Sequence, residues 1–103
     1  VVLGHTACGA VKGACDDAKL GKLTGMLEKI KPAVNSVSEP EDPNLRNSSN
    51  IEFVNKVAEK NVHLTIDKIK ADSEVLAEMV KNNEIKIVGG MYDIQSGAVT
   101  FYE

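Results

Sequence analysis

The sequence predicts an α/β fold: a mostly parallel β-sheet flanked by helices and closed by a C-terminal antiparallel hairpin. Three observations support this prediction. The chain opens on a continuous apolar run, Val1–Leu3, which is typical of a parallel strand buried on both faces. Its middle part carries apolar residues at three- and four-residue steps, the pattern of amphipathic helices. Two closing segments, Glu84–Tyr92 and Ala98–Tyr102, are joined by a short turn that contains glycine, as in a hairpin.

Composition limits the classes of protein to which the chain can belong. With 103 residues, of which 43% are hydrophobic, it is one domain or part of one. The net charge of −3 argues against nucleic-acid binding, which needs a clustered basic surface. No run approaches the roughly 18 apolar residues of a membrane span, and two cysteines are too few for a disulfide scaffold. We therefore expect no nucleic-acid partner and no membrane partner.

The first strand leads into a turn that carries two chemically distinctive side chains. Gly4 ends the apolar run, and His5 and Cys8 follow it, three residues apart. Ligands of open α/β sheets tend to bind at the carboxyl ends of strands, and imidazole nitrogen and thiolate sulfur are both good zinc ligands. The pair supplies only two of the three or four protein ligands that zinc usually takes. A buried cysteine beside a capping histidine therefore stays open as the alternative interpretation.

Two helices are expected after this turn. The first runs over Cys8–Asp16 and contains Cys15, which we interpret as a small buried hydrophobe without chemistry of its own. The second runs over Lys22–Val37. Its apolar stripe consists of Leu23, Met26, Leu27, Ile30 and Val34. Pro32 lies inside this pattern, so we expect the helix to kink or split, because proline has no N–H to donate.

A polar loop and a long helix form the centre of the chain. Ser38–Asn50 is rich in proline, asparagine and serine, which predicts a weakly ordered surface loop with Arg46 in solvent. Ile51–Ala71 follows as a long amphipathic helix that Asn50 can cap. His63 lies off the apolar stripe of this helix and has no partner at helical spacing, so we do not assign it to a metal site.

The C-terminal part adds one more helix and the hairpin. Ser73 is expected to cap a helix that ends near Lys81. Its inward-facing residues are predicted to be Val75, Leu76, Met79 and Val80. Within the strand that follows, Gly89-Gly90 indicates a bend or the close approach of another part of the backbone.

The turn and the rest of the chain share a resemblance with one family. The segment Gly4–Ala10, Gly-His-Thr-Ala-Cys-Gly-Ala, resembles the second zinc motif of the β-class carbonic anhydrases. The likeness, to bacterial members, continues in order through residues 20–27, 29–34, 55–57, 61–62 and 85–94, with Gly97 and Val99. The resemblance therefore covers essentially the whole chain.

This resemblance implies a function and a set of site residues. It implies zinc-dependent, reversible hydration of carbon dioxide to bicarbonate, with His5 and Cys8 as zinc ligands. Gly9 would offer a backbone N–H near the bound substrate or bicarbonate. Members of the family form dimers or larger assemblies, so a homo-oligomer is expected.

One part of the family pattern is missing from the sequence. The third zinc ligand and an Asp–Arg pair come from a Cys-x-Asp-x-Arg motif ahead of the histidine, whereas here Cys15 follows His5 and Arg46 is the only arginine. Residues 1–103 therefore resemble the C-terminal part of a single domain that begins earlier, with no catalytic residue assigned and little activity expected when isolated. Alternatives are a carbon disulfide or carbonyl sulfide hydrolase of the same fold, and a non-catalytic oligomerisation or metal-binding domain. The compartment, bacterial cytoplasm or periplasm, stays open.

Overall fold

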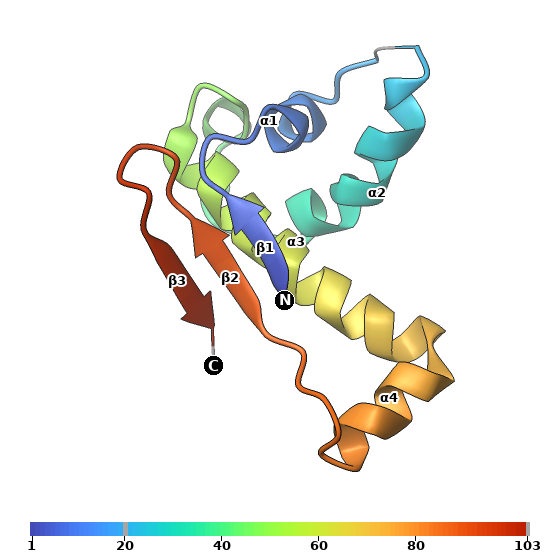
Figure 1. Ribbon diagram of the computed structural model, residues 1–103. Helices are drawn as coiled ribbons and strands as arrows, with labels where there is room; N and C mark the ends of the chain where they lie inside the picture. Colours follow the sequence, from blue (N-terminus) through green and yellow to red (C-terminus); the bar gives the residue numbers. More distant parts are fainter. Residues whose placement is uncertain (20, 103) are drawn as a thin grey trace.

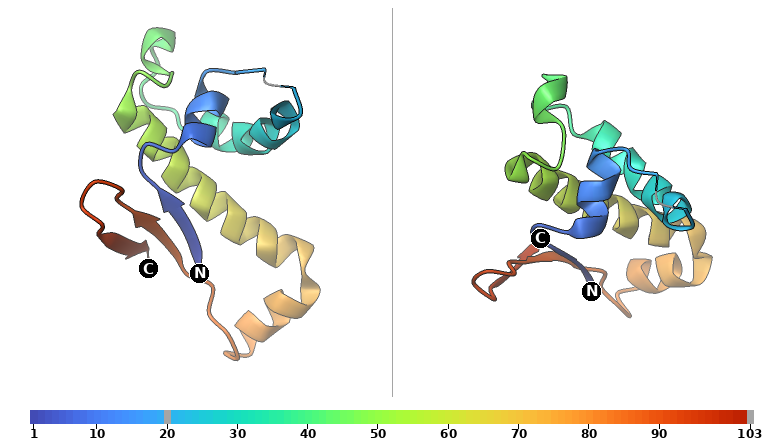
Figure 2. Two further views of the ribbon diagram at one scale, coloured as in Figure 1. Left: turned by 45° about the horizontal axis from the view of Figure 1, so that its top comes forward. Right: turned by 90° about the horizontal axis from the view of Figure 1, so that it is seen from above.

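A computed structural model describes residues 1–19 and 21–102 of the chain. The elements in chain order are β1 (Val2–His5), α1 (Gly9–Cys15), α2 (Leu23–Ser36), a 3-10 helix η1 (Pro43–Leu45), α3 (Ile51–Asp72), α4 (Glu74–Lys81), β2 (Gly89–Tyr92) and β3 (Val99–Tyr102). Figure 1 shows α3 running behind the strands, and Figure 2 shows that one face of the sheet rests on this helix. The helices α1 and α2 pack on α3 as well, so α3 lies at the centre of the fold.

The sheet is mixed, with the strands in the order β1-β2-β3. β1 pairs with β2 in parallel, so that Val2 lies opposite Gly89, and β2 pairs with β3 antiparallel. This arrangement confirms the predicted α/β class with a closing hairpin. The expectation that Val1–Leu3 is covered on both faces is wrong for this chain, because only α3 covers the sheet among the described residues. Leu3 on the other face is 52% exposed.

Glycines let α3 approach the sheet closely. A Cβ atom added to Gly89 would lie 2.7 Å from Cγ1 of Val62 and 2.9 Å from Cδ1 of Ile66. One added to Gly4 would lie 2.8 Å from Cγ2 of Val62. All three separations are far shorter than ordinary van der Waals contact, which begins at about 3.4 Å. At Gly89 the close neighbours are therefore side chains of α3. The close approach of backbone that the Gly89-Gly90 pair predicts is found at Gly90, where an added Cβ would lie 3.0 Å from the carbonyl oxygen of Thr100.

The hydrophobic core lies where α1, α2 and α3 meet. Its buried members are Val11, Ala14, Cys15, Ala33, Val34, Phe53, Val54, Val57 and Ala58. Phe53, Val54 and Val57 are the largest side chains that are fully buried, and all three belong to α3. The backbone of this part of α3 is therefore held firmly, and Cys15 is buried as predicted.

The helices begin and end close to where the sequence predicts. Asn50 caps α3, since its side chain accepts a hydrogen bond from the N–H of Phe53 at 3.4 Å. Ser73 caps α4 in the same way, through the N–H of Leu76 at 3.2 Å. α2 continues through Pro32 as one helix and is not split there. Among the described helices, none is both long enough and apolar enough to cross a membrane.

Some apolar positions predicted to face inward are exposed. Met26 of α2 is 44% exposed and Val75 of α4 is 69% exposed, and Leu76 is exposed as well. The physical reason is that α4 packs on α3 alone within the described part of the chain, so most of its apolar face has no neighbour. The strand predicted over Glu84–Tyr92 is also shorter than expected, because only Gly89–Tyr92 pairs with other strands.

Arg46 orders the loop after α2, so the expectation that it lies in solvent is wrong. Its Nη1 donates hydrogen bonds to the carbonyl oxygens of Val37 at 2.7 Å and Pro40 at 3.0 Å. Its Nη2 donates to the carbonyl of Val34 at 3.0 Å, at the C-terminal end of α2. The guanidinium carbon lies 4.8 Å from the ring centroid of Phe53 on α3, within cation–π range. One side chain therefore joins the loop to two helices.

Candidate functional site

The turn between β1 and α1 carries the predicted pair of metal ligands. His5 is the last residue of β1 and lies opposite Tyr92 of β2 in the parallel register. Cys8 is the N-cap residue of α1, and its carbonyl oxygen accepts the N–H of Lys12 at 2.9 Å. The carboxyl end of a strand and the start of a helix thus place the imidazole and the thiol on either side of one short turn.

Three long-range hydrogen bonds fix the turn. Ala7 has a φ of 51°, in the left-handed region, and its N–H donates to Oδ1 of Asn55 on α3 at 3.0 Å. The N–H of Thr6 donates to the carbonyl of Tyr92 at 3.0 Å. The hydroxyl oxygen of Thr6 accepts the N–H of Ile94 at 3.1 Å. The turn is therefore joined to α3 on one side and to the β2–β3 hairpin on the other.

The ring of His5 makes a hydrogen bond that defines its free nitrogen. Nδ1 lies 2.9 Å from the carbonyl oxygen of Thr6. A carbonyl can only accept, so Nδ1 carries the proton and donates it to this bond. In the neutral ring the lone pair is then on Nε2, the arrangement found in most histidines that bind a metal.

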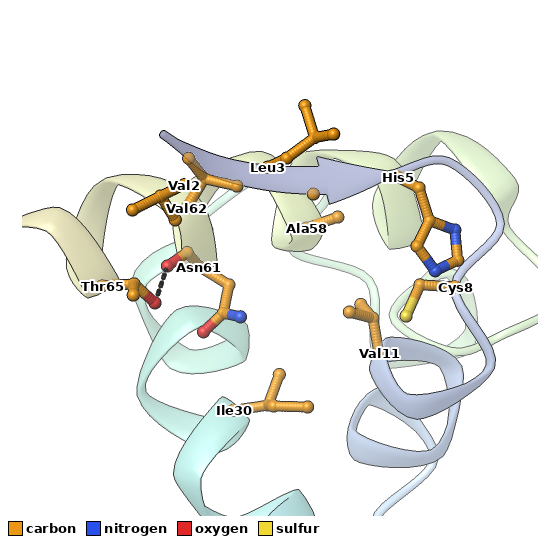
Figure 3. A pocket seen from close by; sticks show the side chains of 11 residues that line it. Val2, Leu3, His5, Cys8, Val11, Ile30, Ala58, Asn61, Val62 and Thr65 are labelled. Carbon is orange, nitrogen blue, oxygen red and sulfur yellow. Dashed lines mark hydrogen bonds between the residues drawn. The ribbon is translucent and has the colours of Figure 1, made fainter. Parts of the chain in front are cut away.

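His5 and Cys8 line the same cavity. The cavity has a volume of about 300 Å³ and lies between β1, α1, α2 and α3. Its wall is largely apolar, with side chains such as Val11 and Ile30, and Asn61 lies among them. Figure 3 shows His5 and Cys8 at one end of this cavity and Asn61 at the other. The two candidate ligands are therefore brought to one place, as the sequence predicts.

These residues fit zinc, but they do not complete its coordination. Imidazole nitrogen with thiolate sulfur is a donor set that suits Zn²⁺. Within residues 1–19 and 21–102, however, no group of three or more His, Cys, Asp or Glu side chains could hold a metal ion. A protein site with three ligands therefore needs a further residue from outside this part of the chain. Gly9 begins α1, and a Cβ atom there would meet nothing within 4 Å, so its backbone is open to a small molecule.

The other titratable candidates lie elsewhere, as expected. His63 is exposed on α3, with Nε2 3.9 Å from the carboxylate of Glu59 and its ring 4.9 Å from that of Tyr102. The premise that His63 has no partner at helical spacing is therefore wrong, because Glu59 lies four residues earlier on the same helix. Cys15 is a free thiol in the core and the last residue of α1. Burial raises the pKa of the Cys15 thiol to about 11, and the carboxylate of Asp16 acts in the same direction.

Reasoning from the sequence did not identify Asn55 as a residue that shapes this site. The only signal in the sequence was that Asn55 belongs to a segment that resembles the family. That resemblance indicated no contact between Asn55 and the turn. The left-handed conformation of Ala7 has no signature in the sequence, because glycine and asparagine are the residues usually found there.

The mixed sheet, the central helix and the His-x-x-Cys turn at the end of β1 define a protein of the β-carbonic anhydrase type. Comparison with protein families confirms this class: the model of the carbonic anhydrase family matches residues 1–99, and the chain belongs to that family.

Curated relatives and solved structures agree. The chain is 28% identical over 102 residues to carbonic anhydrase 2 of Mycobacterium tuberculosis, in strains CDC 1551 / Oshkosh and ATCC 25618 / H37Rv. These alignments cover 94% of this chain and 45% of each relative, so the chain spans about half the length of the relatives that it matches.

Among solved structures, the chain resembles tetrameric β-carbonic anhydrases from the filamentous ascomycete Sordaria macrospora. The TM-score is 0.72 at 20% identity, over 96% of this chain and 49% of that one. It also resembles the β-carbonic anhydrase CcaA, with a TM-score of 0.74 at 18% identity, over 99% of this chain and 45% of that one. These likenesses concern the fold.

Proposed function

We propose that these residues are the C-terminal part of a β-carbonic anhydrase domain that catalyses the zinc-dependent, reversible hydration of carbon dioxide to bicarbonate. One observation carries the proposal: in a chain of the carbonic anhydrase family, His5 and Cys8 lie on one fixed turn and line one cavity. Zinc, when bound, lowers the pKa of a water ligand to about 7 and so supplies hydroxide at neutral pH.

The chain's own residues would hold and orient the metal. The bond from Nδ1 of His5 to the carbonyl of Thr6 would orient the ring and leave Nε2 available as the ligand atom. Cys8 would bind as a thiolate, a soft ligand that donates charge to zinc. The backbone N–H of Gly9, at the open start of α1, is our proposed contact to substrate or bicarbonate. No proton-transfer step is assigned, since no catalytic acid or base is identified in this chain.

The third protein ligand would come from outside these residues. β1 is an edge strand of the sheet, and among the described residues no strand pairs with its free edge. A parallel strand added there would end beside His5, because the carboxyl ends of parallel strands meet at one edge of a sheet. We propose that the family's Cys-x-Asp-x-Arg motif reaches the site in this way.

The proposal includes a homo-oligomer, supported by the tetrameric β-carbonic anhydrases that share this fold. A second candidate function is a non-catalytic metal-binding or oligomerisation domain. The observation that favours it is the lack of a third ligand in the described part of the chain. Assays with carbon dioxide, carbon disulfide and carbonyl sulfide separate these candidates. Preference for carbon dioxide supports the anhydrase, preference for a sulfur compound supports a hydrolase of the same fold, and no turnover of any of the three supports the non-catalytic domain.

Metal analysis of variants in the native full-length polypeptide tests the zinc ligands. Cys8→Ser replaces a thiolate with a poorly ionised hydroxyl, and His5→Ala removes the imidazole. Both are expected to lose zinc and carbon dioxide hydration together, because two ligands or fewer hold zinc weakly. Cys15→Ala and His63→Ala are matched controls and should keep the zinc content of the parent. Stoichiometric zinc in Cys8→Ser after dialysis would contradict the assignment.

A further inference from the structure

The turn between the two candidate ligands adopts a conformation that its own residues do not favour. Ala7 has a φ of 51°, a left-handed conformation that residues with a Cβ rarely adopt unless their surroundings hold them there. Ala7 separates Thr6 from Cys8, so its φ and ψ angles set the direction in which the chain leaves β1 and begins α1. A change at Ala7 would therefore move Cys8 relative to His5.

Asn55 is the group that holds Ala7. Its Oδ1 accepts the N–H of Ala7 at 3.0 Å, across a sequence separation of 48 residues. The backbone around Asn55 is fixed, because Val54 and Val57 on the same helix are fully buried in the core. The bond to Ala7 therefore connects the turn to the most firmly packed helix of the fold, shown behind the strands in Figure 1.

Thr6 completes the support from the opposite side. Its backbone N–H and its hydroxyl oxygen are bonded to Tyr92 and Ile94 of the hairpin. These bonds hold the part of the turn next to His5, whereas Asn55 holds the part next to Cys8. The two ligands are therefore fixed by different elements, and the bond from the N–H of Ala7 to Asn55 joins the cysteine side of the turn to α3.

We propose that Asn55 is a positioning residue for the metal site: its side-chain carbonyl keeps Ala7 left-handed and so sets the placement of Cys8 relative to His5. This inference rests on the proposed function, in which these two residues bind zinc. The feature that matters is the acceptor oxygen. Asn55→Asp keeps an oxygen in the same place, whereas Asn55→Ala removes it and leaves the N–H of Ala7 without its partner.

The experiment compares Asn55→Ala, Asn55→Asp and the control Lys56→Ala in the native full-length polypeptide. Lys56 is the next residue of α3 and is exposed. One readout is hydrogen exchange of the Ala7 amide. The others are the dissociation constant for Zn²⁺ and the thiolate-to-metal absorption band of the Co²⁺-loaded protein, which reports the placement of Cys8.

We expect Asn55→Ala to speed exchange at Ala7 and to raise the dissociation constant for Zn²⁺ by about 10- to 100-fold, the usual loss when a residue that orients metal ligands is removed. The cobalt band should shift as well. In Asn55→Asp, the exchange rate at Ala7 and the dissociation constant for Zn²⁺ should lie close to those of the parent. Lys56→Ala should change neither quantity. If Asn55→Ala folds poorly, adding Ala7→Gly should recover binding, because glycine adopts a positive φ without help from a partner.

Three results would overturn the inference. One is parental zinc affinity and an unchanged cobalt band in folded Asn55→Ala. The second is equal loss in Asn55→Ala and Asn55→Asp, which would exclude the acceptor oxygen as the cause. The third is retention of zinc by His5→Ala and Cys8→Ser, which would contradict the proposed function itself. The last case is recognised separately, since exchange at Ala7 reports the hydrogen bond that its N–H donates to Asn55 whether or not zinc binds.

Discussion

The thiol of Cys15 differs from that of Cys8 in its surroundings. Cys15 lies in the core between α1, α2 and α3, and is only 8% exposed. Its pKa is raised from 9.0 to about 11, first by burial and then by the nearby carboxylate of Asp16, while Lys31 and Arg46 act weakly in the opposite direction. The folded state therefore favours the protonated thiol, and this has a consequence for stability at alkaline pH.

Stability should fall as the pH rises through the interval from 9.0 to about 11. Below this interval the thiol is protonated in both states and its contribution to stability is fully present. Within it, Cys15 ionises in the unfolded chain but not in the folded one, so ionisation stabilises the unfolded state relative to the folded state. Urea unfolding from pH 8 to 11 measures the effect, and Cys15→Ala provides the comparison because lysines also titrate there. Identical pH profiles for the two proteins would contradict the prediction.

Which residues form the site could be predicted only in part. His5 and Cys8 could be assigned because their types and spacing are those of metal ligands and because a motif surrounds them. Asn55 could not, since its side chain bonds to the backbone N–H of a residue 48 positions away in the sequence. A side chain that recognises a backbone N–H or carbonyl leaves no mark in the sequence of its partner.

At the scale of the elements, the distance between α3 and the sheet is set by residues without side chains. Gly89→Ala would push its new Cβ against Val62 and Ile66. We expect this change to lower the free energy of unfolding by about 1–3 kcal/mol, the usual cost of overpacking. Combining it with Val62→Ala should cost less than the sum of the two single changes, because the smaller residue makes room for the methyl group.

Gly25 provides the matched control for this measurement. It lies on the exposed side of α2, and a Cβ there would meet nothing within 4 Å. Gly25→Ala should raise the free energy of unfolding by up to about 1 kcal/mol, because alanine is the better helix former. Urea unfolding at neutral pH measures all four variants. Additive effects of Gly89→Ala and Val62→Ala would show that the helix and the sheet do not constrain each other there.

The sequence predicts the helices better than their surroundings. The three- and four-residue steps place α2, α3 and α4 near their observed bounds, because the period depends only on the helix itself. Whether an apolar stripe is covered depends on other elements. Met26 and Val75 lie on such stripes and are exposed, since no described element packs over them. The strand expected over Glu84–Tyr92 is longer than the observed β2 for the same reason, because a strand forms only where a partner strand pairs with it.

For the whole molecule, the two-ligand site sets a limit on activity. We expect the 103-residue chain, prepared alone, to hydrate carbon dioxide far more slowly than the native full-length polypeptide. Its described residues offer no third ligand to zinc, and the chain spans 45% of the curated relatives that it matches. Stopped-flow measurement of carbon dioxide hydration at saturating zinc makes the comparison. Comparable zinc-dependent turnover would mean that another residue, or a second copy of the chain, completes the site.

The order in which the residues are synthesised also matters for the turn between β1 and α1. Synthesis proceeds from the N-terminus, so His5 and Cys8 emerge from the ribosome before Asn55, Tyr92 and Ile94. The groups that give their turn its shape belong to Asn55, Tyr92 and Ile94. The strand that pairs with β1 is β2, near the opposite end of the chain. A nascent chain whose β2 segment is still inside the ribosome therefore carries both ligands but lacks the contacts from Tyr92 and Ile94.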